Sequence, residues 1–391
     1  MRRLTMLLIP FLAVALIVTT VGCGSNNDEP TPTLTPTATT PGVSPTPGDG
    51  TETPVYTGGK HTFKIAHSGT VESSTQEFWL LVDQKLRDYT NDKVKLEIYP
   101  AGSLYGSYEV WDALSTGAVD IANLGDYQPM LAGYMNYQIG YLNQFWGSHV
   151  DWENQVDDAW EHDRRFWDHP QGGQTMFKEV EKSGVKMLAC FPSGALQVIM
   201  NKFGMTTMYQ MKDRKIATVG GIIGLFCDYA DATGVMVDPV EFPIAFQQGM
   251  LDLLATGPES CVNQRLYETG KYGYVISALF SHTFWGINLK LWNSLEPELQ
   301  DIIMNKIIPE MKEWVYTDRR NLEWDALKDL EELGVTLTYQ PDEEKLEMRD
   351  GAWTLGWERG YMSDMDIDLV KLADSLRSEP YDQQELPFPD E

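Results

Sequence analysis

The chain has 391 residues, 42% of them hydrophobic, and its 57 acidic residues outnumber 30 basic ones to give a formal net charge of −27. So large an acidic excess argues against nucleic acid as a partner, because two polyanions repel each other. The length is sufficient for two lobes with separate hydrophobic cores.

The N-terminus has the regions of a secretion signal. Arg2 and Arg3 precede an apolar run over residues 6–18, and small residues lead to Cys23. The run is short for a membrane span. We therefore predict a lipoprotein signal peptide at residues 1–22 and a lipid anchor on Cys23. An uncleaved anchor is the alternative, and either one leaves the protein extracytoplasmic, in the periplasm or on the outer face of the cytoplasmic membrane.

Residues 23–60 are rich in Pro, Thr, Ser and Gly and contain almost no large apolar side chains. Such a segment cannot bury enough apolar surface to offset its ordering entropy. We predict a disordered, semi-extended tether, with folding expected to start near His61.

The first lobe is predicted to alternate strands and helices. Residues 63–67 favour a strand, apolar residues at helical spacing from Phe78 to Tyr89 favour a helix, and residues 94–99 alternate as a second strand should. This succession is typical of a parallel sheet. Residues 125–184 are dense in aromatic side chains, which either fill the lobe or stack on an aromatic ligand.

A ten-residue helix-to-strand sequence occurs twice, at residues 113–122 and 245–254, with Ala, Gly and Asp at identical offsets. In each copy an amphipathic run meets a Gly of the kind that ends a helix, and an apolar strand follows. Chance similarity is one interpretation. The other is that each lobe repeats one α/β unit, which predicts a cleft for a small solute where the strands end.

Residues 184–191 and 196–200 are predicted to be strands that leave the first lobe and enter the second, forming a hinge. The second lobe then continues with a strand at 215–218, a helix through Cys227 and a strand at 235–237. A helical run over residues 297–333 is long enough to cross between lobes.

A strand at residues 335–338 and two amphipathic helices that reach about Leu376 complete the predicted fold. The predicted boundaries are as follows: lobe I at 61–190 with a return at about 283–322, lobe II at 191–282 with a return at about 323–378, and an acidic tail at 379–391.

Cysteine and histidine spacing predicts neither a metal site nor a cofactor. There is no CxxC pair, and the six His form no cluster with ligand spacing. Beyond the lipidation site, the chain contains Cys190, Cys227 and Cys261. A disulfide between Cys227 and Cys261 and three buried free thiols both fit the sequence, and we favour free thiols.

The chain resembles the extracytoplasmic solute-binding proteins of tripartite ATP-independent periplasmic (TRAP) transporters over about residues 61–365. The segments that carry the resemblance are 64–67, 94–100 with Gly106, 113–122, 184–188, 211–216 and 242–252. The resemblance implies a two-lobed α/β fold of the periplasmic-binding-protein type (type II-like), with hinge strands and a long helix spanning both lobes. It also implies closure over a small organic acid and delivery of that solute to the membrane permease of a TRAP transporter.

One departure from the family bears on the ligand. The strand at 215–217 usually ends in an arginine that binds the ligand carboxylate, and here that position is Ala217. Either another cation replaces it, with Arg214, Lys215 and Arg265 as candidates, or the ligand lacks a carboxylate. Residues 253–258 also lack the carboxylate of metal-using members, although Thr256 and Glu259 could contact a neutral polar solute.

Strand-end positions predict the residues that line the cleft. They are His67, Ser68, Thr70, Glu72, Gly125, Asp126, Tyr127, Ala217, Thr218, Phe242 and Pro258. No nucleophile elbow or phosphate loop is present, so we predict a binding protein and not an enzyme. A solute sensor that feeds a signalling receptor or another transporter is the alternative, and a hydrolase or isomerase is a remote one.

Overall fold

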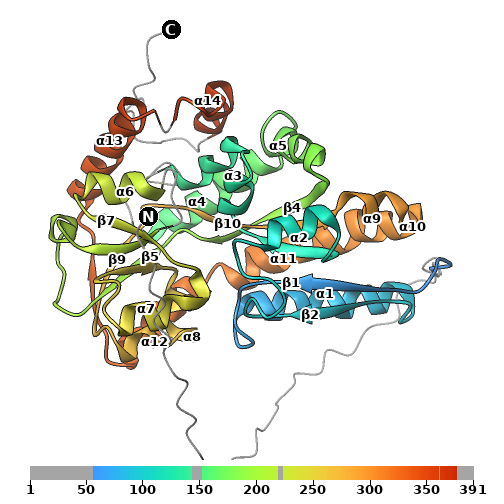
Figure 1. Ribbon diagram of the computed structural model, residues 1–391, viewed down its shortest axis with the longest axis horizontal. Helices are drawn as coiled ribbons and strands as arrows, with labels where there is room; N and C mark the ends of the chain where they lie inside the picture. The colour runs from blue at the N-terminus through green and yellow to red at the C-terminus, as the bar shows by residue number, and fades with distance from the viewer. Residues whose placement is uncertain (1–55, 143–151, 219–222, 361, 377–391) are drawn as a thin grey trace, which may run out of the picture. The chain divides into compact units, whose positions relative to one another are not determined.

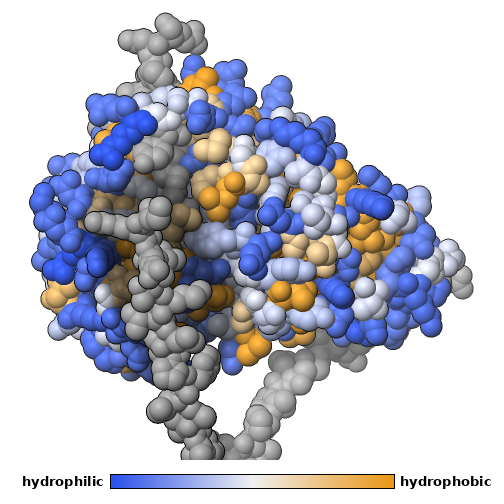
Figure 2. All heavy atoms as spheres, in the orientation of Figure 1, coloured by the Kyte–Doolittle hydropathy of each residue, from blue (hydrophilic) through white to orange (hydrophobic). Residues whose placement is uncertain are grey.

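The computed structural model describes residues 56–142, 152–218, 223–360 and 362–376. The predicted signal peptide, Cys23, most of the predicted tether and the acidic tail lie outside these residues. Helices flank two larger sheets and one two-stranded sheet in the described part of the chain (Figure 1). Hydrophilic side chains dominate the periphery of the face in Figure 2. Among the described residues, no helix is both long enough and apolar enough to span a membrane.

Lobe I is built on a five-stranded sheet. Its order is β2 (Val94–Tyr99), β1 (His61–Ala66), β3 (Ile121–Leu124), β10 (Ser281–Asn288) and β4 (Val185–Gly194). The strand β1 is parallel to β2 and β3, which confirms the predicted parallel unit. The strand β10 joins antiparallel to both of its neighbours.

The predicted first helix is α1 (Ser74–Thr90), which packs one apolar face on this sheet. The Ser73 hydroxyl oxygen accepts a hydrogen bond from the Gln76 backbone N–H and caps the helix. Phe78 and Trp79 are buried, and Trp79 meets Trp285 of β10 edge to face. Aromatic packing therefore joins α1 to the sheet.

The folded part begins earlier than predicted. Tyr56 is fully buried, the backbone N–H of Thr57 donates to Glu298, and that of Gly59 donates to Glu296. The predicted tether, which extends to residue 60, is thus too long. The prediction overlooked Tyr56, because this aromatic residue lies in a segment that otherwise consists mostly of small and polar residues.

Both copies of the repeated sequence adopt the same structure. In the first, α2 (Val110–Thr116) ends at Gly117 with a φ of 82°; in the second, α7 (Phe242–Gln247) is followed by Gly249 with a φ of 73°. The N–H one residue beyond each Gly donates to the carbonyl of the repeated Ala. These left-handed turns require glycine and reverse the chain toward the next strand.

The aspartate of each copy closes the unit in the same way. The backbone N–H of Lys64 donates to Asp120 Oδ2 at 2.8 Å, and the backbone N–H of Lys215 donates to Asp252 Oδ2 at 2.9 Å. Each carboxylate thereby ties its turn to the neighbouring strand. The repetition is structural in origin, and the interpretation by chance is wrong.

Lobe II contains a four-stranded sheet in the order β11 (Thr336–Tyr339), β9 (Tyr272–Ile276), β5 (Gln197–Asn201) and β8 (Leu254–Thr256). A two-stranded parallel sheet of β6 (Lys215–Thr218) and β7 (Thr233–Met236) lies beside it, joined through a bridge from Ile216 to Leu253. The predicted strands of this lobe are therefore present, within two residues of the expected bounds.

In the described part of the chain, two strand-to-strand connections cross between the larger sheets. The predicted crossing from β4 to β5 is confirmed, and the chain crosses back from β9 to β10. The second crossing lies between Ile276 and Ser281, close to the return to lobe I that was predicted at about residue 283. Two adjacent crossings form the type of hinge on which two lobes can rotate.

The predicted long helix is present but interrupted. It comprises α10 (Pro297–Ile302), a π-helical segment at Ile303–Ile307, α11 (Ile308–Trp314), a second π-helical segment at Val315–Arg319, and α12 (Leu322–Glu332). The α11 part pairs with α1 of lobe I through Glu310 and Lys85, whereas α12 packs on α8 (Pro258–Asn263) of lobe II. The run therefore spans both lobes (Figure 1).

The C-terminal helices divide between the lobes. The helix α13 (Asp342–Glu358) packs on α6 (Ile223–Tyr229) of lobe II. The helix α14 (Ile367–Ser375) instead contacts α4 (Trp152–Trp167), where His162 Nε2 lies 2.6 Å from the Ala373 carbonyl oxygen. Since α4 packs on β4, the return to lobe II predicted for residues 323–378 does not hold for α14.

The remaining elements are short. They are α3 (Tyr127–Leu131), α5 (Gly173–Glu179), α9 (Leu289–Ser294), and 3-10 helices at Met135–Tyr141, Val180–Ser183, Met208–Met211, Pro239–Glu241 and Leu266–Glu268.

Candidate functional site

A cavity of about 300 Å³ lies where the two lobes meet and is lined by residues of both. Lobe I contributes loops that follow β1 and β3, and lobe II contributes β8 and the start of α8. The predicted residues that line this cavity are Ser68, Thr70, Gly125, Asp126, Tyr127, Phe242 and Pro258. Strand-end position thus located the cavity.

A second cavity, of about 160 Å³, adjoins the first. It is lined by the two other lobe II residues that were predicted, Ala217 and Thr218. The two cavities share lining residues, among them Tyr127 and Phe242. Apolar side chains predominate around the smaller cavity.

Two predicted residues, His67 and Glu72, line neither of these cavities. His67 is buried inside lobe I, where its Nε2 lies 2.9 Å from Gln76 Oε1, and burial lowers its pKa. Glu72 is exposed to solvent. Strand-end position specifies the edge of the sheet but not the side toward which each loop residue turns.

Asp126 lines the larger cavity, but its carboxylate is engaged by His282. Asp126 Oδ2 accepts the His282 backbone N–H at 3.0 Å, and Oδ1 lies 2.8 Å from Nδ1. The other ring nitrogen contacts Asp163. Burial by itself would lower the pKa of His282, but the two carboxylates outweigh it and raise that pKa to about 10. This buried ion cluster ties β10 to the loop after β3.

None of the predicted substitute cations lines either cavity. The Arg214 guanidinium stacks 3.7 Å from the Phe203 ring centroid, Lys215 is exposed, and the Arg265 side chain is 72% exposed. Among the described residues, two other basic residues line the larger cavity: His282, which is held between Asp126 and Asp163, and Arg319. Sequence analysis missed Arg319 because the candidates were taken from lobe II, at Arg214, Lys215 and Arg265; the relevant signal is a basic residue within the crossing helix.

Arg319 is 7% exposed and faces an acidic partner from α8. Its Nη2 lies 3.8 Å from Glu259 Oε2. Burial lowers the pKa of the guanidinium, while Glu259 and Glu323 act in the opposite direction. An arginine stays charged under such shifts, so the cavity contains a fixed positive charge.

Glu259 joins the lobes at the start of α1. Its Oε1 accepts the backbone N–H of Ser74 at 2.6 Å, and its Oε2 accepts the Ser74 hydroxyl at 2.7 Å. A carboxylate is stabilised at a helix N-terminus by the free N–H groups and the helix dipole. A second contact across the lobes lies outside the cavity, where Asp238 accepts the N–H and the hydroxyl of Ser107 at 3.1 and 2.9 Å. The lobes are therefore closed on each other.

Glu323 connects the hinge to the cavity. Its two carboxylate oxygens accept the backbone N–H groups of Ala195 and Leu196, at 3.0 and 2.7 Å, in the crossing from β4 to β5. Complete burial raises its pKa to about 7, although the two N–H donors favour the ionised form. Sequence analysis missed this residue too, since no local pattern marks it.

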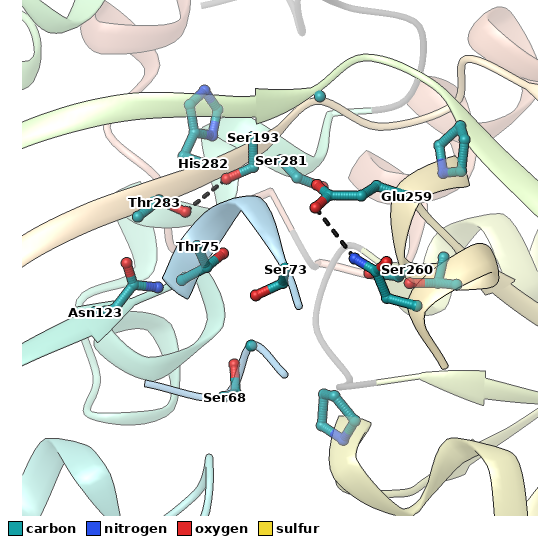
Figure 3. A pocket seen from close by; sticks show the side chains of 18 of the residues that line it. Ser68, Ser73, Thr75, Asn123, Ser193, Glu259, Ser260, Ser281, His282 and Thr283 are labelled. Carbon is teal, nitrogen blue, oxygen red and sulfur yellow. Dashed lines mark hydrogen bonds between the residues drawn. The ribbon is translucent and has the colours of Figure 1, made fainter. Parts of the chain in front are cut away.

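The rest of the cavity wall is rich in neutral polar groups. Figure 3 shows Ser68, Ser73, Thr75 and Asn123 on the lobe I side, opposite Glu259 and Ser260, with the hydrogen-bonded pair Ser193 and Thr283 above them. Within the described residues, Thr70 Oγ1 and Gln264 Oε1 are buried without a hydrogen-bond partner. The residues Thr70 and Gln264 line the cavity from opposite lobes. Buried polar atoms of this kind call for a ligand or water.

The three cysteines Cys190, Cys227 and Cys261 are buried free thiols, which confirms the favoured interpretation.

The fold is similar to solved structures of TRAP periplasmic solute-binding proteins. A protein from Desulfovibrio salexigens with bound orotic acid matches at a TM-score of 0.71 and 20% identity, over 81% of this chain and 98% of that one. A protein from Sulfurospirillum deleyianum with bound succinate matches at a TM-score of 0.72 and 16% identity, over 82% of this chain and 100% of that one. The sugar acid binding protein of Advenella mimigardefordensis, in complex with galactonate, matches at a TM-score of 0.72 and 14% identity, over 81% of this chain and 98% of that one.

Because the sequence identities are 20% or lower, these structural matches establish the two-lobed fold alone. The sequence model of a single family matches residues 65–355, which include both lobes, both hinge crossings and the helix that bears Arg319. The chain belongs to family 7 of the bacterial extracellular solute-binding proteins (DctP).

Proposed function

We propose that this protein captures a small organic acid outside the cytoplasmic membrane and delivers it to the membrane permease of a TRAP transporter. The observation that carries the proposal is the cavity between the lobes, with a buried unpartnered oxygen on each side, Thr70 Oγ1 and Gln264 Oε1. A solute that contacts both walls of this cavity links the lobes. The family membership and the acids named for the structurally similar proteins support the same role.

The mechanism is hinge closure. The open form admits the solute, and contacts from both lobes stabilise the closed form once the cavity is filled. Ser68, Thr70, Gly125 and Tyr127 supply the lobe I wall. On the other side, Phe242 and Pro258 line the larger cavity, and Ala217 and Thr218 line the smaller one. Binding without a chemical step is sufficient for this role, so the proposal includes no catalytic residue.

We infer that the N-terminal segment holds the protein at a membrane surface. A lipid on Cys23 would hold it at the outer face of a membrane, and the Pro- and Thr-rich segment would keep the lobes clear of the lipid surface. Mass spectrometry of the membrane-bound protein tests this part: a diacylglyceryl group on an N-terminal Cys23 is expected, and an intact Met1 would overturn it.

A thermal-shift panel tests the capture of acids. The full chain in detergent is denatured and refolded to remove bound solute, then heated with aliphatic acids, aromatic acids and neutral analogues. At about 100 times its dissociation constant, a true ligand adds about 2.7 kcal/mol to the free energy of unfolding. We expect a shift with at least one carboxylate. Shifts with neutral analogues only, or with none, would contradict the proposal.

A further inference from the structure

Arg319 presents hydrogen-bond donors to the larger cavity that its protein contacts leave unused. Its contact with Glu259, at 3.8 Å, is longer than a hydrogen bond. No hydrogen bond from its side chain to another described residue is present. A guanidinium carries five N–H donors in a planar fork that matches a carboxylate, and a buried charge is costly without such a partner. The fork is therefore suited to an anion entering the cavity.

The two acidic side chains nearest to this charge are satisfied by other donors. Glu259 accepts from Ser74 and from the Asn263 side-chain amide at 3.2 Å, and Glu323 accepts from two hinge N–H groups. Because burial raises the pKa of Glu323 to about 7, this residue is partly protonated near neutral pH. A bound carboxylate therefore meets less opposing charge than the number of acids suggests.

The unpartnered oxygens define a second requirement. Gln264 Oε1 can only accept a hydrogen bond, and Thr70 Oγ1 can accept or donate one. A carboxylate by itself supplies no donor to Gln264. A solute hydroxyl does, so the cavity favours an acid that also carries a hydroxyl group.

The smaller cavity has a different character. Most of the side chains that line it are apolar or weakly polar, among them those of Ile216, Ala217, Phe226, Cys227, Ile276 and Leu279. Its volume of about 160 Å³ is close to the ~150 Å³ of an apolar cavity that binds one benzene molecule. Ala217 stands here where the family resemblance led us to expect an arginine. In this chain Arg319 lines the larger cavity, and the lining of the smaller one, the chamber beside Ala217, is mostly apolar.

We propose that the solute is a hydroxy acid with an apolar end: its carboxylate binds Arg319, its hydroxyl group bonds within the larger cavity, and a ring or branched group of about benzene size fills the chamber beside Ala217. This inference rests on the proposed function and adds the chemical class of the ligand. The two cavities share Tyr127, Tyr141, Phe242, Thr256, Gly257 and Ser281, so one molecule can occupy both.

Isothermal titration of the refolded full chain with three matched probes tests the inference. They are 3-phenyllactate, lactate, which lacks the ring, and 3-phenylpropane-1,2-diol, which lacks the carboxylate. Phenyllactate should bind at least about tenfold more tightly than lactate, because the ring leaves water. It should also bind at least about tenfold more tightly than the diol, because the diol leaves the guanidinium unpaired.

Variants assign each end of the probe to its chamber. Arg319→Gln should weaken phenyllactate at least about tenfold and leave the diol nearly unchanged. Ala217→Phe should abolish the preference for phenyllactate over lactate. The matched control is Arg265→Gln, an arginine that lies outside both cavities and should bind all probes like wild type. Circular dichroism confirms that each variant is folded.

The outcomes separate this inference from the proposed function. If the broader acid panel gives thermal shifts but phenyllactate binds no better than lactate or the diol, or if Arg319→Gln binds it like wild type, the ligand class is wrong and acid capture stands. Should Ala217→Phe fail to fold, the three-probe comparison on wild type decides. If no acid of the panel binds, the proposed function itself fails.

Discussion

The contact between Asp238 and Ser107 offers a test of lobe closure through two residues that do not themselves line either cavity. Asp238→Ala removes two hydrogen bonds across the lobes, from the N–H and hydroxyl of Ser107. A hydrogen bond to a charged group contributes about 1.5–3 kcal/mol, and we take the lower value because Asp238 is only half-buried. The closed form then loses about 3 kcal/mol, which weakens solute binding by up to about 100-fold.

Titration calorimetry with an acid from the panel measures this loss. Ser107→Ala removes only the hydroxyl bond and should weaken binding about tenfold. The double variant should match Asp238→Ala, since both substitutions act on one contact. Ser294→Ala should bind like wild type, because among the described residues the Ser294 hydroxyl bonds to the Leu291 carbonyl of its own helix and to no other group. Equal affinities for wild type and Asp238→Ala would refute the idea that this contact holds the lobes closed.

Three further predictions concern stability and reactivity. Asp120→Ala and Asp252→Ala should each lower the free energy of unfolding in urea by about 1–2 kcal/mol, and additively because they lie in different lobes; strong coupling would contradict this. Because its pKa is raised, Glu323 is held more favourably in its protonated form by the folded protein. Its contribution to the free energy of unfolding is therefore complete below its ordinary pKa of 4.5 and is lost as pH rises through about 7, a difference of about 3 kcal/mol. Urea titrations should give a lower free energy of unfolding at pH 8 than at pH 5, and Glu323→Gln should remove most of this difference. An equally large difference in the variant would contradict the prediction. Because burial raises the pKa values of the three cysteine thiols in the lobes, a thiol reagent should label them only after unfolding, and rapid labelling of the native protein would contradict this.

Local periodicity predicted the local structure well. The apolar spacing from Phe78 to Tyr89 and the alternation over residues 94–99 each indicate one face packed on a core, and α1 and β2 formed there. The repeated Ala, Gly and Asp correctly indicated a repeated turn. The bond from each Asp to a strand N–H could not be predicted, because it depends on the pairing of a strand distant in sequence.

The charged residues of the candidate site escaped prediction for a physical reason. Arg319 and Glu323 lie on a helix whose π-helical segments each shift the helical phase, by about 100° for one extra residue. The face that Arg319 presents therefore cannot be extrapolated from Pro297 by a regular period. Asp126 shows the converse error, since strand-end position was right but His282, far along the chain, engages its carboxylate.

A crystal structure of residues 53–391 with the tightest-binding acid of the panel tests the capture of solute most directly. We predict the acid in the cavity between the lobes, hydrogen-bonded to residues of both, with Thr70 Oγ1 and Gln264 Oε1 partnered by the solute or its waters. An acid bound to one lobe alone, or on the outer surface with this cavity empty, would contradict the proposed function.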